Sequence, residues 1–265
     1  MRTPLTCLVA GLVLALAPAT AAAGPLVDSD ADWAHAAVVS ADALARSQPR
    51  LAQAIASDEP VPSRSGQPLF IDASWRVPEA AGALLVRIAE GADSPAERVG
   101  LLDALSRTKG DWSSAVVGLL ASEASPEVRR MMVEILREAP VDAARAGVQL
   151  GLADADASVR AAAVRVIGNH VDGVELGDLA VSALSDNAVV VRTEAARSIG
   201  YAGYSAGFGP MRSLLADADA DVRFRALRSL QKLDSTKVVG LPELSTLAAD
   251  ADPRVAREAG KLLGR

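Results

Sequence analysis

The chain has 265 residues and a formal charge of −6, and half of its residues are hydrophobic while only 3% are aromatic. The acidic balance argues against general nucleic-acid binding. A core built mainly from Ala, Leu and Val favours closely stacked helices over a β-sandwich, which would need more β-branched and aromatic residues.

Residues 1–23 have the order of a secretory signal peptide. The positive end Met1–Arg2 precedes an apolar core, Leu5–Ala17, and small residues then lead to a cleavage site ahead of Gly24. Cleavage two residues earlier is the near alternative, and a core helix or a retained anchor is the competing interpretation. The apolar core is shorter than the ~20 residues of a membrane span. We therefore expect export to a periplasm or secretion, a mature chain without a membrane span and, because Cys7 is removed, without disulfides.

Residues 24–78 are expected to form a helical cap followed by a strap. Asp30 or Asp32 can begin a helix that runs to about Arg46, and a second short helix is expected over Pro49–Ala56. The residues of the first helix that we expect to share one side are Ala36, Val39 and Ala43.

The Pro-rich stretch 58–78 interrupts the helical pattern but contains Leu69–Ile71 and Trp75, which are too apolar for a free linker. We interpret it as an extended strap that covers the end of a helical stack together with Trp33. A lid over a binding groove is the alternative.

From residue 79 onward one phrase returns at steps of 31 to 33 residues: an acid, Val five residues later, and then Arg. A fixed period of this length predicts stacked helix pairs, and hence an all-α solenoid. The Arg column contains Arg98, Arg129, Arg160, Arg192, Arg223 and, altered, Ala256. Six repeats are expected, at 79–108, 110–139, 141–170, 173–201, 205–233 and 239–265.

Each repeat is expected to contain two helices. In the second helix, the positions one before, three after and seven after the Arg form one apolar stripe, as in Val191, Ala195 and Ile199. Ser or Asp residues can cap the second helices, and Pro begins three of them. First helices are expected near 79–90, 111–122, 142–153, 174–184, 206–216 and 241–249. Second helices are expected near 95–107, 126–138, 157–169, 188–201, 220–232 and 253–264.

This pattern resembles the HEAT repeat, and its short period with helix ends at Ile167–Gly168 and Ile199–Gly200 is similar to the HEAT-like repeats of phycobilisome lyases. The resemblance covers 79–265, about 70% of the chain, and weakens where Glu97 replaces Val and Ala256 replaces Arg. It implies an armadillo-like superhelix with the Val–Arg helix on the concave side. It also implies a ladder in which the Asp of one repeat bonds the Arg of its neighbour. The ladder residues are Asp154, Asp186, Asp217, Arg129, Arg160, Arg192 and Arg223.

Catalytic and metal sites have little support in the sequence. The two histidines, His35 in the expected cap and His170 in a loop, suggest neither a triad nor a His–Cys metal site. Asp217–Asp221 resembles the start of a calcium loop, but Val222 stands where Gly is needed and Arg228 where Glu is needed. Helix capping explains these acids better. We expect no catalysis, no cofactor and no metal.

A row of bases on the outward face of the second helices is the candidate binding site. The column five residues after the Arg changes from two acids to four bases: Asp103, Glu134, Arg165, Arg197, Arg228 and Lys261. Stacked helices lie ~10 Å apart, so the four bases would form a stripe that can hold another protein or an acidic extended peptide. Arg225 and Arg257 lie near this stripe. The alternative is a solvated face whose charges pair locally, for example Glu194 with Arg197.

Tyr201 and Phe224 are expected to border the same face. Four of the eight aromatic residues fall between positions 201 and 224. Aromatic residues beside Arg are common in binding hot spots. The alternative is that they fill the junction between two repeats.

These features together predict a non-catalytic protein-binding or scaffolding module that works through its concave face. An enzyme accessory or lyase-like chaperone for a small ligand is the alternative, which a deep closed pocket would favour. A purely structural envelope protein is the third option. The export signal argues against a chromophore lyase, and with the acidic charge it argues against a DNA-repair enzyme.

Overall fold

The computed structural model describes residues 29–57, 77, 80–89, 94–109 and 112–264, and every regular element in these ranges is a helix. The chain divides into two compact units, residues 1–135 and 136–265. The predicted signal peptide, nearly all of the strap, and Trp75 lie outside the described residues, as do the side chains of Trp33 and His35.

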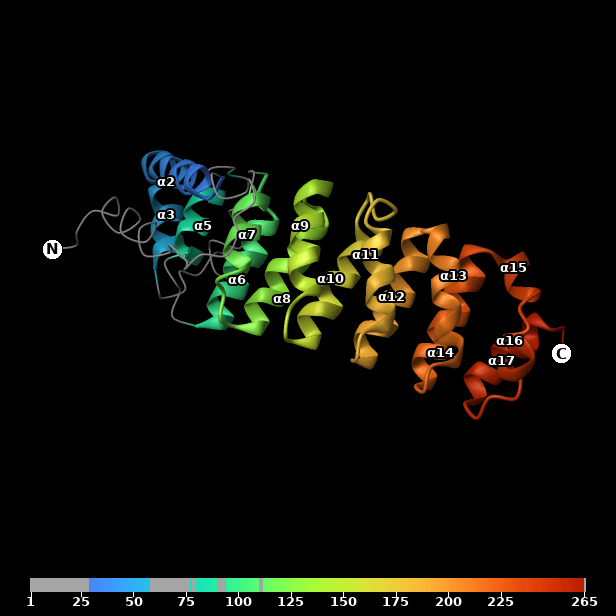
Figure 1. The fold of residues 1–265 in the computed structure, drawn as a ribbon. Helices are drawn as coiled ribbons and strands as arrows, with labels where there is room; N and C mark the ends of the chain where they lie inside the picture. Colours follow the sequence, from blue (N-terminus) through green and yellow to red (C-terminus); the bar gives the residue numbers. More distant parts are fainter. Residues whose placement is uncertain (1–28, 58–76, 78–79, 90–93, 110–111, 265) are drawn as a thin grey trace, which may run out of the picture. The chain divides into compact units, whose positions relative to one another are not determined.

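Unit 1 (residues 1–135) is built from helices that pack mainly against helices close to them in the sequence. The helix α2 packs against α3 and α5, α5 packs against α6, and α6 packs against α8 (Figure 1). Its helices are α2 (Ser29–Ser47), α3 (Pro49–Ala56), α5 (Ala80–Ala89), α6 (Pro95–Ser106), α7 (Ser113–Leu120) and α8 (Pro126–Ile135).

The predicted first helix is present as α2, and its buried side is not the side that carries Ala36 and Val39. Ala37 and Leu44 are buried instead, while Val39 is 53% exposed and Ala36 is exposed. Helix α5 approaches this buried side closely, since a Cβ on Gly82 would lie 2.5 Å from the Ala37 carbonyl oxygen. The lack of a side chain at Gly82 permits this approach.

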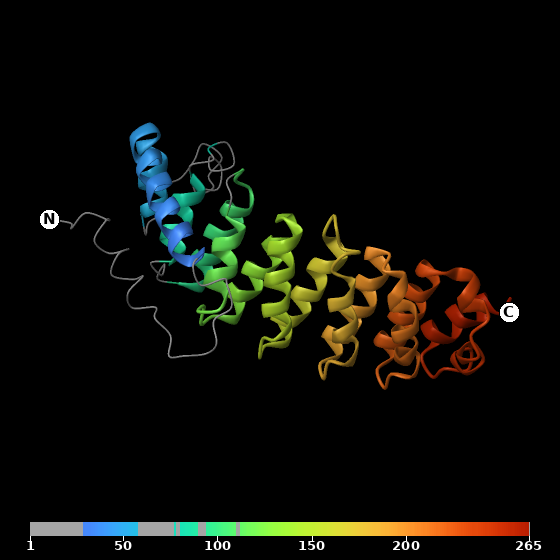
Figure 2. The same cartoon turned by 45° about the horizontal axis from the view of Figure 1, so that its top comes forward.

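Unit 2 (residues 136–265) consists of helix pairs stacked side by side, the arrangement of an α-solenoid. The second helices α10, α12, α14 and α17 each pack on the next, and α9 and α11 pack on α10 and α12 (Figures 1 and 2). The elements are η2 (Leu136–Glu138), α9 (Val141–Leu152), α10 (Ala157–Asn169), α11 (Gly177–Ser182), η3 (Ala183–Ser185), α12 (Val189–Ala202), η4 (Ser205–Gly207), α13 (Phe208–Met211), η5 (Arg212–Ala216), α14 (Ala220–Leu233), α15 (Ser235–Val239), α16 (Glu243–Leu247) and α17 (Pro253–Leu262).

The predicted apolar stripe forms the core of unit 2. Val191, Ala195 and Ile199 on α12 are fully buried, and the equivalent residues of α10 and α14 are buried to the same extent. Leu263 is the exception, since it is half-buried. Capping follows the sequence as well: the carboxylate of Asp219 accepts the N–H groups of Asp221 and Val222 at the start of α14.

The first helices depart from the prediction more than the second helices do. The segment expected as one helix over 206–216 divides into η4, α13 and η5, because Gly207, Gly209 and Pro210 disfavour a continuous helix. The short helix α15 was not predicted, although Asp234 caps it by accepting the N–H of Lys237.

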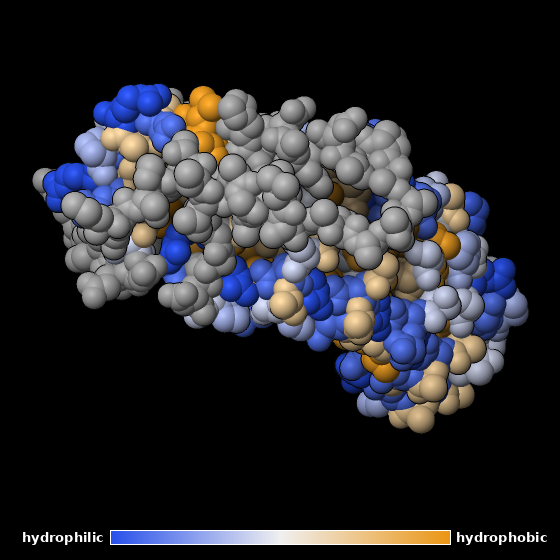
Figure 3. All heavy atoms as spheres, turned by 60° about the vertical axis from the view of Figure 1, so that its left-hand side comes forward, coloured by the Kyte–Doolittle hydropathy of each residue, from blue (hydrophilic) through white to orange (hydrophobic). Residues whose placement is uncertain are grey.

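None of the helices in the described part of the chain is long and apolar enough to cross a membrane. In the view of Figure 3 the described atoms are mostly hydrophilic, and apolar residues occur as separate spots. Exposed apolar side chains such as Leu150 and Val171 are scattered in the same way, which is normal for protein surfaces.

Candidate functional site

Arginines of unit 2 bind the aspartates of the following repeat through two parallel hydrogen bonds. Arg192 donates from Nε to Oδ2 of Asp217 (2.7 Å) and from Nη2 to Oδ1 (2.9 Å). Arg160 binds Asp186 in the same way at 2.8 and 3.0 Å, and Arg223 binds Asp250 at 2.7 Å for both bonds. We call these three pairs the Arg–Asp ladder.

Both partners of the Arg–Asp ladder make further hydrogen bonds in their own repeat. Arg192 Nη1 donates to the carbonyls of Asp186 (2.9 Å) and Asn187 (3.2 Å). The Asp186 carboxylate accepts the N–H of Ala188 (2.8 Å), which lies just before α12. The side chains of the three pairs are only 8% to 16% exposed. Each pair therefore ties one repeat to the loop that begins the next second helix.

The electrostatics of the Arg–Asp ladder favour the charged forms. The hydrogen bond from Arg160 lowers the pKa of Asp186 below its ordinary value, and the hydrogen bond from Arg223 does the same to the pKa of Asp250. Burial raises the pKa of Asp217, but the hydrogen bonds that it accepts outweigh this effect and lower it overall. The arginines and aspartates of the ladder thus bind one another in their charged forms, and the ladder has a structural role.

The remaining predicted ladder residues are Arg129 in unit 1 and Asp154 in unit 2, and each makes hydrogen bonds within its own unit. In unit 1, Arg129 Nη1 donates to the carbonyls of Glu123 (3.1 Å) and Ala124 (2.8 Å). In unit 2, Asp154 accepts the N–H of Asp156 (2.8 Å). Unit 1 has a comparable pair in which Arg98 Nε lies 3.0 Å from Glu123 Oε2.

Two partners, Asp250 and Glu123, were missed as ladder members from the sequence. Both occupy the acid position of the repeated phrase. The column itself could therefore have identified them.

The four bases of the predicted stripe lie on the exposed side of the second helices of unit 2, but none of them is without a partner. Glu194 bridges Arg165 (3.7 Å) and Arg197 (2.7 Å), and Glu258 bridges Arg228 (3.6 Å) and Lys261 (3.5 Å). We call this surface the second-helix face. The local pairing that we considered as the alternative, Glu194 with Arg197, is present. Because the bases are 20% to 65% exposed, each such pair contributes about 0–1 kcal/mol and can exchange with other partners.

The two predicted aromatic residues also lie on the second-helix face, each beside two cations. The Tyr201 ring has Lys232 Nζ 3.9 Å from its centroid and the Arg197 guanidinium carbon at 5.1 Å. The Phe224 ring has Arg228 at 6.0 Å and Arg254 at 5.7 Å. Tyr201 is 55% exposed, so it does not simply fill a junction between repeats. Cations at these distances hold aromatic rings in place.

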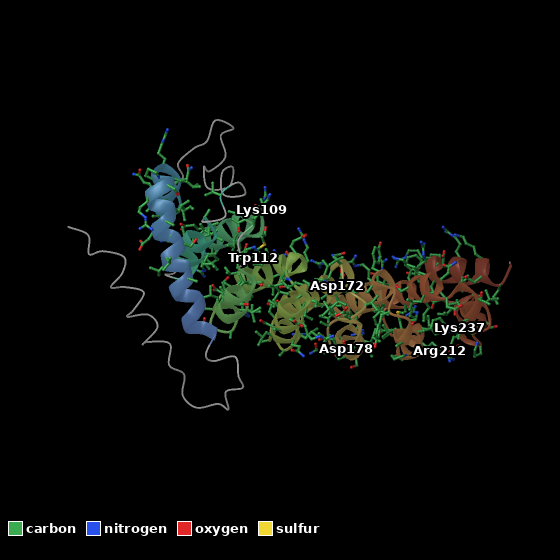
Figure 4. All side chains as sticks on the ribbon, turned by 90° about the horizontal axis from the view of Figure 1, so that it is seen from above. Lys109, Trp112, Asp172, Asp178, Arg212 and Lys237 are labelled. Atoms are coloured by element: carbon green, nitrogen blue, oxygen red, sulfur yellow. The ribbon has the colours of Figure 1, made fainter. Side chains whose placement is uncertain are left out.

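The first helices of unit 2 carry separate ion pairs. Arg145 contacts Asp178 (3.2 Å) and also donates to the Glu175 carbonyl, while Arg212 binds Glu243 at 2.6 Å. Asp178 and Arg212 are labelled in Figure 4. Charges on this side are therefore also paired across repeats.

The other sites considered from the sequence have structural roles. His170 is buried, with Nε2 2.9 Å from the Ala139 carbonyl oxygen and Nδ1 accepting the N–H of Asp172 (2.9 Å). Asp219, at the centre of the calcium-like sequence, caps α14. Within the described ranges, no three His, Cys, Asp or Glu side chains are grouped so that they could hold a metal ion.

A small hollow lies in unit 1 between α5, α6 and the loop before α8. Its volume is about 190 Å³, below the 300–1,000 Å³ typical of ligand pockets. The charged groups that line it, Arg98 and Glu123, already bind each other. It offers no convergent free polar groups for a ligand.

The fold and these contacts define an all-α solenoid of stacked helical repeats. A family model of HEAT repeats matches residues 177–264, which supports the HEAT repeat family. Two crystal structures of engineered proteins are similar to the chain. One is 23% identical, covers 70% of this chain and 89% of its own, and has a TM-score of 0.45. The other is 18% identical, covers 96% and 77%, and has a TM-score of 0.44. No curated protein matches the chain.

Proposed function

We propose that the protein is a non-catalytic scaffold that binds an acidic, extended segment of another protein on the second-helix face of unit 2. The observation that carries this proposal is the row of partly exposed bases, Arg165, Arg197, Arg228 and Lys261, with aromatic rings beside it. The match to HEAT repeats supports protein binding in general. We propose that this face is the concave side of the superhelix, which is what the resemblance to short-period HEAT-like repeats implies.

The charge balance of the face supports an acidic partner. Two acids, Glu194 and Glu258, form the ion pairs of all four bases. Three further bases of α14 and α17 take part in no ion pair among the described residues: Arg225, Lys232 and Arg257. The face thus has a surplus of positive charge although the whole chain is acidic. Complementary charge of this kind steers encounter and fixes orientation.

A matched pair of charge-reversal variants tests the proposal. The test variant replaces Arg165, Arg197, Arg228 and Lys261 by Glu. The control variant replaces four bases of unit 2 that lie outside the second-helix face, namely Arg137, Arg145, Arg212 and Lys237. These control bases also have acidic partners, so both variants break ion pairs and change the net charge equally.

Capture of partners from an extract of the native compartment is then compared at equal protein concentration. We expect the test variant to lose the partner that the wild type and the control retain, and we expect salt to weaken capture because the contacts are exposed. Equal capture by the wild type and the test variant removes the proposal.

We also propose that the chain is exported, because residues 1–23 have the order of a signal peptide. The mass of the protein isolated from its native cell tests this. The expected N-terminus is Gly24, with Ala22 as the near alternative. A mature chain that retains Leu5–Ala17 overturns export by cleavage.

A further inference from the structure

Among the cations of α14 and α17 that take part in no ion pair within the described residues, Arg225 is the one that occupies the same column as the bridging glutamates. The residue two after the Arg column is Glu194 on α12, Arg225 on α14 and Glu258 on α17, so Arg225 stands between two glutamates. Those glutamates bridge bases at the position five after the column. Arg225 itself takes part in no ion pair among the described residues.

The guanidinium of Arg225 is also incompletely hydrogen-bonded. Its Nε atom is buried and has no hydrogen-bond partner, while the residue as a whole is half-buried. A buried donor without an acceptor carries the full desolvation penalty of that group. The buried Nε is therefore costly in the unliganded protein, and a partner cannot reach it. A carboxylate can bind only the part of the guanidinium that stays exposed, where it would supply the missing counter-ion.

One aromatic ring of the second-helix face lies on α14, the helix of Arg225, and the other lies on the adjacent helix α12. Phe224 is the neighbour of Arg225 in the chain, and Tyr201 on α12 is in contact with Lys232, which lies two turns further along α14. Helices α12 and α14 pack directly against each other (Figure 1). The rings are held by cations at 3.9 to 6.0 Å, so they offer ordered apolar contact area on the second-helix face that also carries Arg225.

We infer that Arg225 is the anchor of the binding face and receives a side-chain carboxylate of an acidic peptide segment in the partner. The planar guanidinium binds a carboxylate through two parallel hydrogen bonds, which gives orientation as well as affinity. Tyr201 and Phe224 contact the peptide on either side of this carboxylate. The inference rests on the proposed function, but it assigns the main contact to Arg225 and not to the row of four bases, which already share two glutamates.

Binding of a fluorescein-labelled poly-glutamate peptide to the full chain, followed by fluorescence anisotropy, tests the inference. Arg225→Gln is expected to weaken binding by about tenfold or more, the scale of one lost charge-assisted contact. Lys261→Gln, which removes a base that already has an acid, is expected to weaken it by about twofold. Arg225→Lys keeps the positive charge but loses the planar guanidinium with its two parallel donors. Its affinity for the peptide is expected to lie between those of Arg225→Gln and the wild type. Arg212→Gln on the first-helix side is the matched control.

Thermal unfolding separates an anchor from a structural residue. Since Arg225 lacks a partner, Arg225→Gln is expected to leave the unfolding temperature unchanged or to raise it. If the wild type binds the peptide and Arg225→Gln binds it equally well, the inference is wrong while the proposed function stands. If Arg225→Gln loses binding and stability together, Arg225 is structural and the inference is again wrong. If the wild type does not bind the peptide, the acidic-partner proposal fails with it.

Discussion

Replacing Arg192 by Gln tests the Arg–Asp ladder at its best-defined pair. Arg192 makes four hydrogen bonds, two to the carboxylate of Asp217 and two to the carbonyls of the preceding loop. The two side chains are 16% and 9% exposed. Removing one member of a buried ion pair costs about 3–5 kcal/mol, and the remaining exposure reduces this to about 2–4 kcal/mol. We expect a loss of that size in the free energy of unfolding.

Urea unfolding of the full chain, followed by circular dichroism, measures this loss. Arg137→Gln is the control, because its pair with Glu138 is 56% and 61% exposed and its loss should cost less than about 1 kcal/mol. Asp217→Asn and the double variant complete a cycle, for which we expect a coupling energy of about 1–3 kcal/mol. The reasoning fails if Arg192→Gln costs no more than the control, or if the two substitutions are additive.

Gly200→Ala should destabilise the protein by about 1–2 kcal/mol because the new Cβ would lie 2.8 Å from the Cβ of Ser229. A Cβ at Gly260 on α17 would have nothing within 4 Å, so Gly260→Ala should stabilise the protein by about 0.5–1 kcal/mol. Unfolding temperatures that rank the two variants the other way would contradict this account of the helix packing. The pKa of Asp186 is lowered in the folded protein from its ordinary value of 3.8. The pair of Asp186 with Arg160 therefore stabilises the protein fully at pH values above 3.8, and this stabilisation is lost as the pH falls through the folded pKa. Unfolding temperatures measured from pH 7 to pH 3 should therefore decline at the acid end, and less steeply in Asp186→Asn. Glu194→Gln should release the two arginines that it bridges and tighten poly-glutamate binding about threefold at low salt; unchanged anisotropy would show that those arginines do not contact the peptide.

The repeated phrase was sufficient to predict the fold of unit 2. The period placed Val191, Ala195 and Ile199 on one stripe, and all three are fully buried. The structure differs from the sequence-based expectation in one place before the repeats and in one place within them. Which side of α2 is buried depends on its packing against α3 and α5, and no pattern within α2 reveals that packing. The segment 206–216 was predicted as one helix from its position in the repeat, while its own Gly and Pro residues determine a broken one.

The charged face shows a different limit of sequence reasoning. A column of bases such as Arg197 and Arg228 can be found by counting residues, because equivalent positions of stacked helices lie side by side. Whether those bases are available to a partner depends on a second column, where Glu194 and Glu258 are close enough to reach them. The second column reverses sign at Arg225, and that reversal leaves the Arg225 guanidinium without an acid among the described residues. The position of an unpaired charge in a stacked repeat protein therefore depends on two adjacent columns of residues. It is found by pairing the bases of one column with the acids of the other and noting which charged residue has no partner.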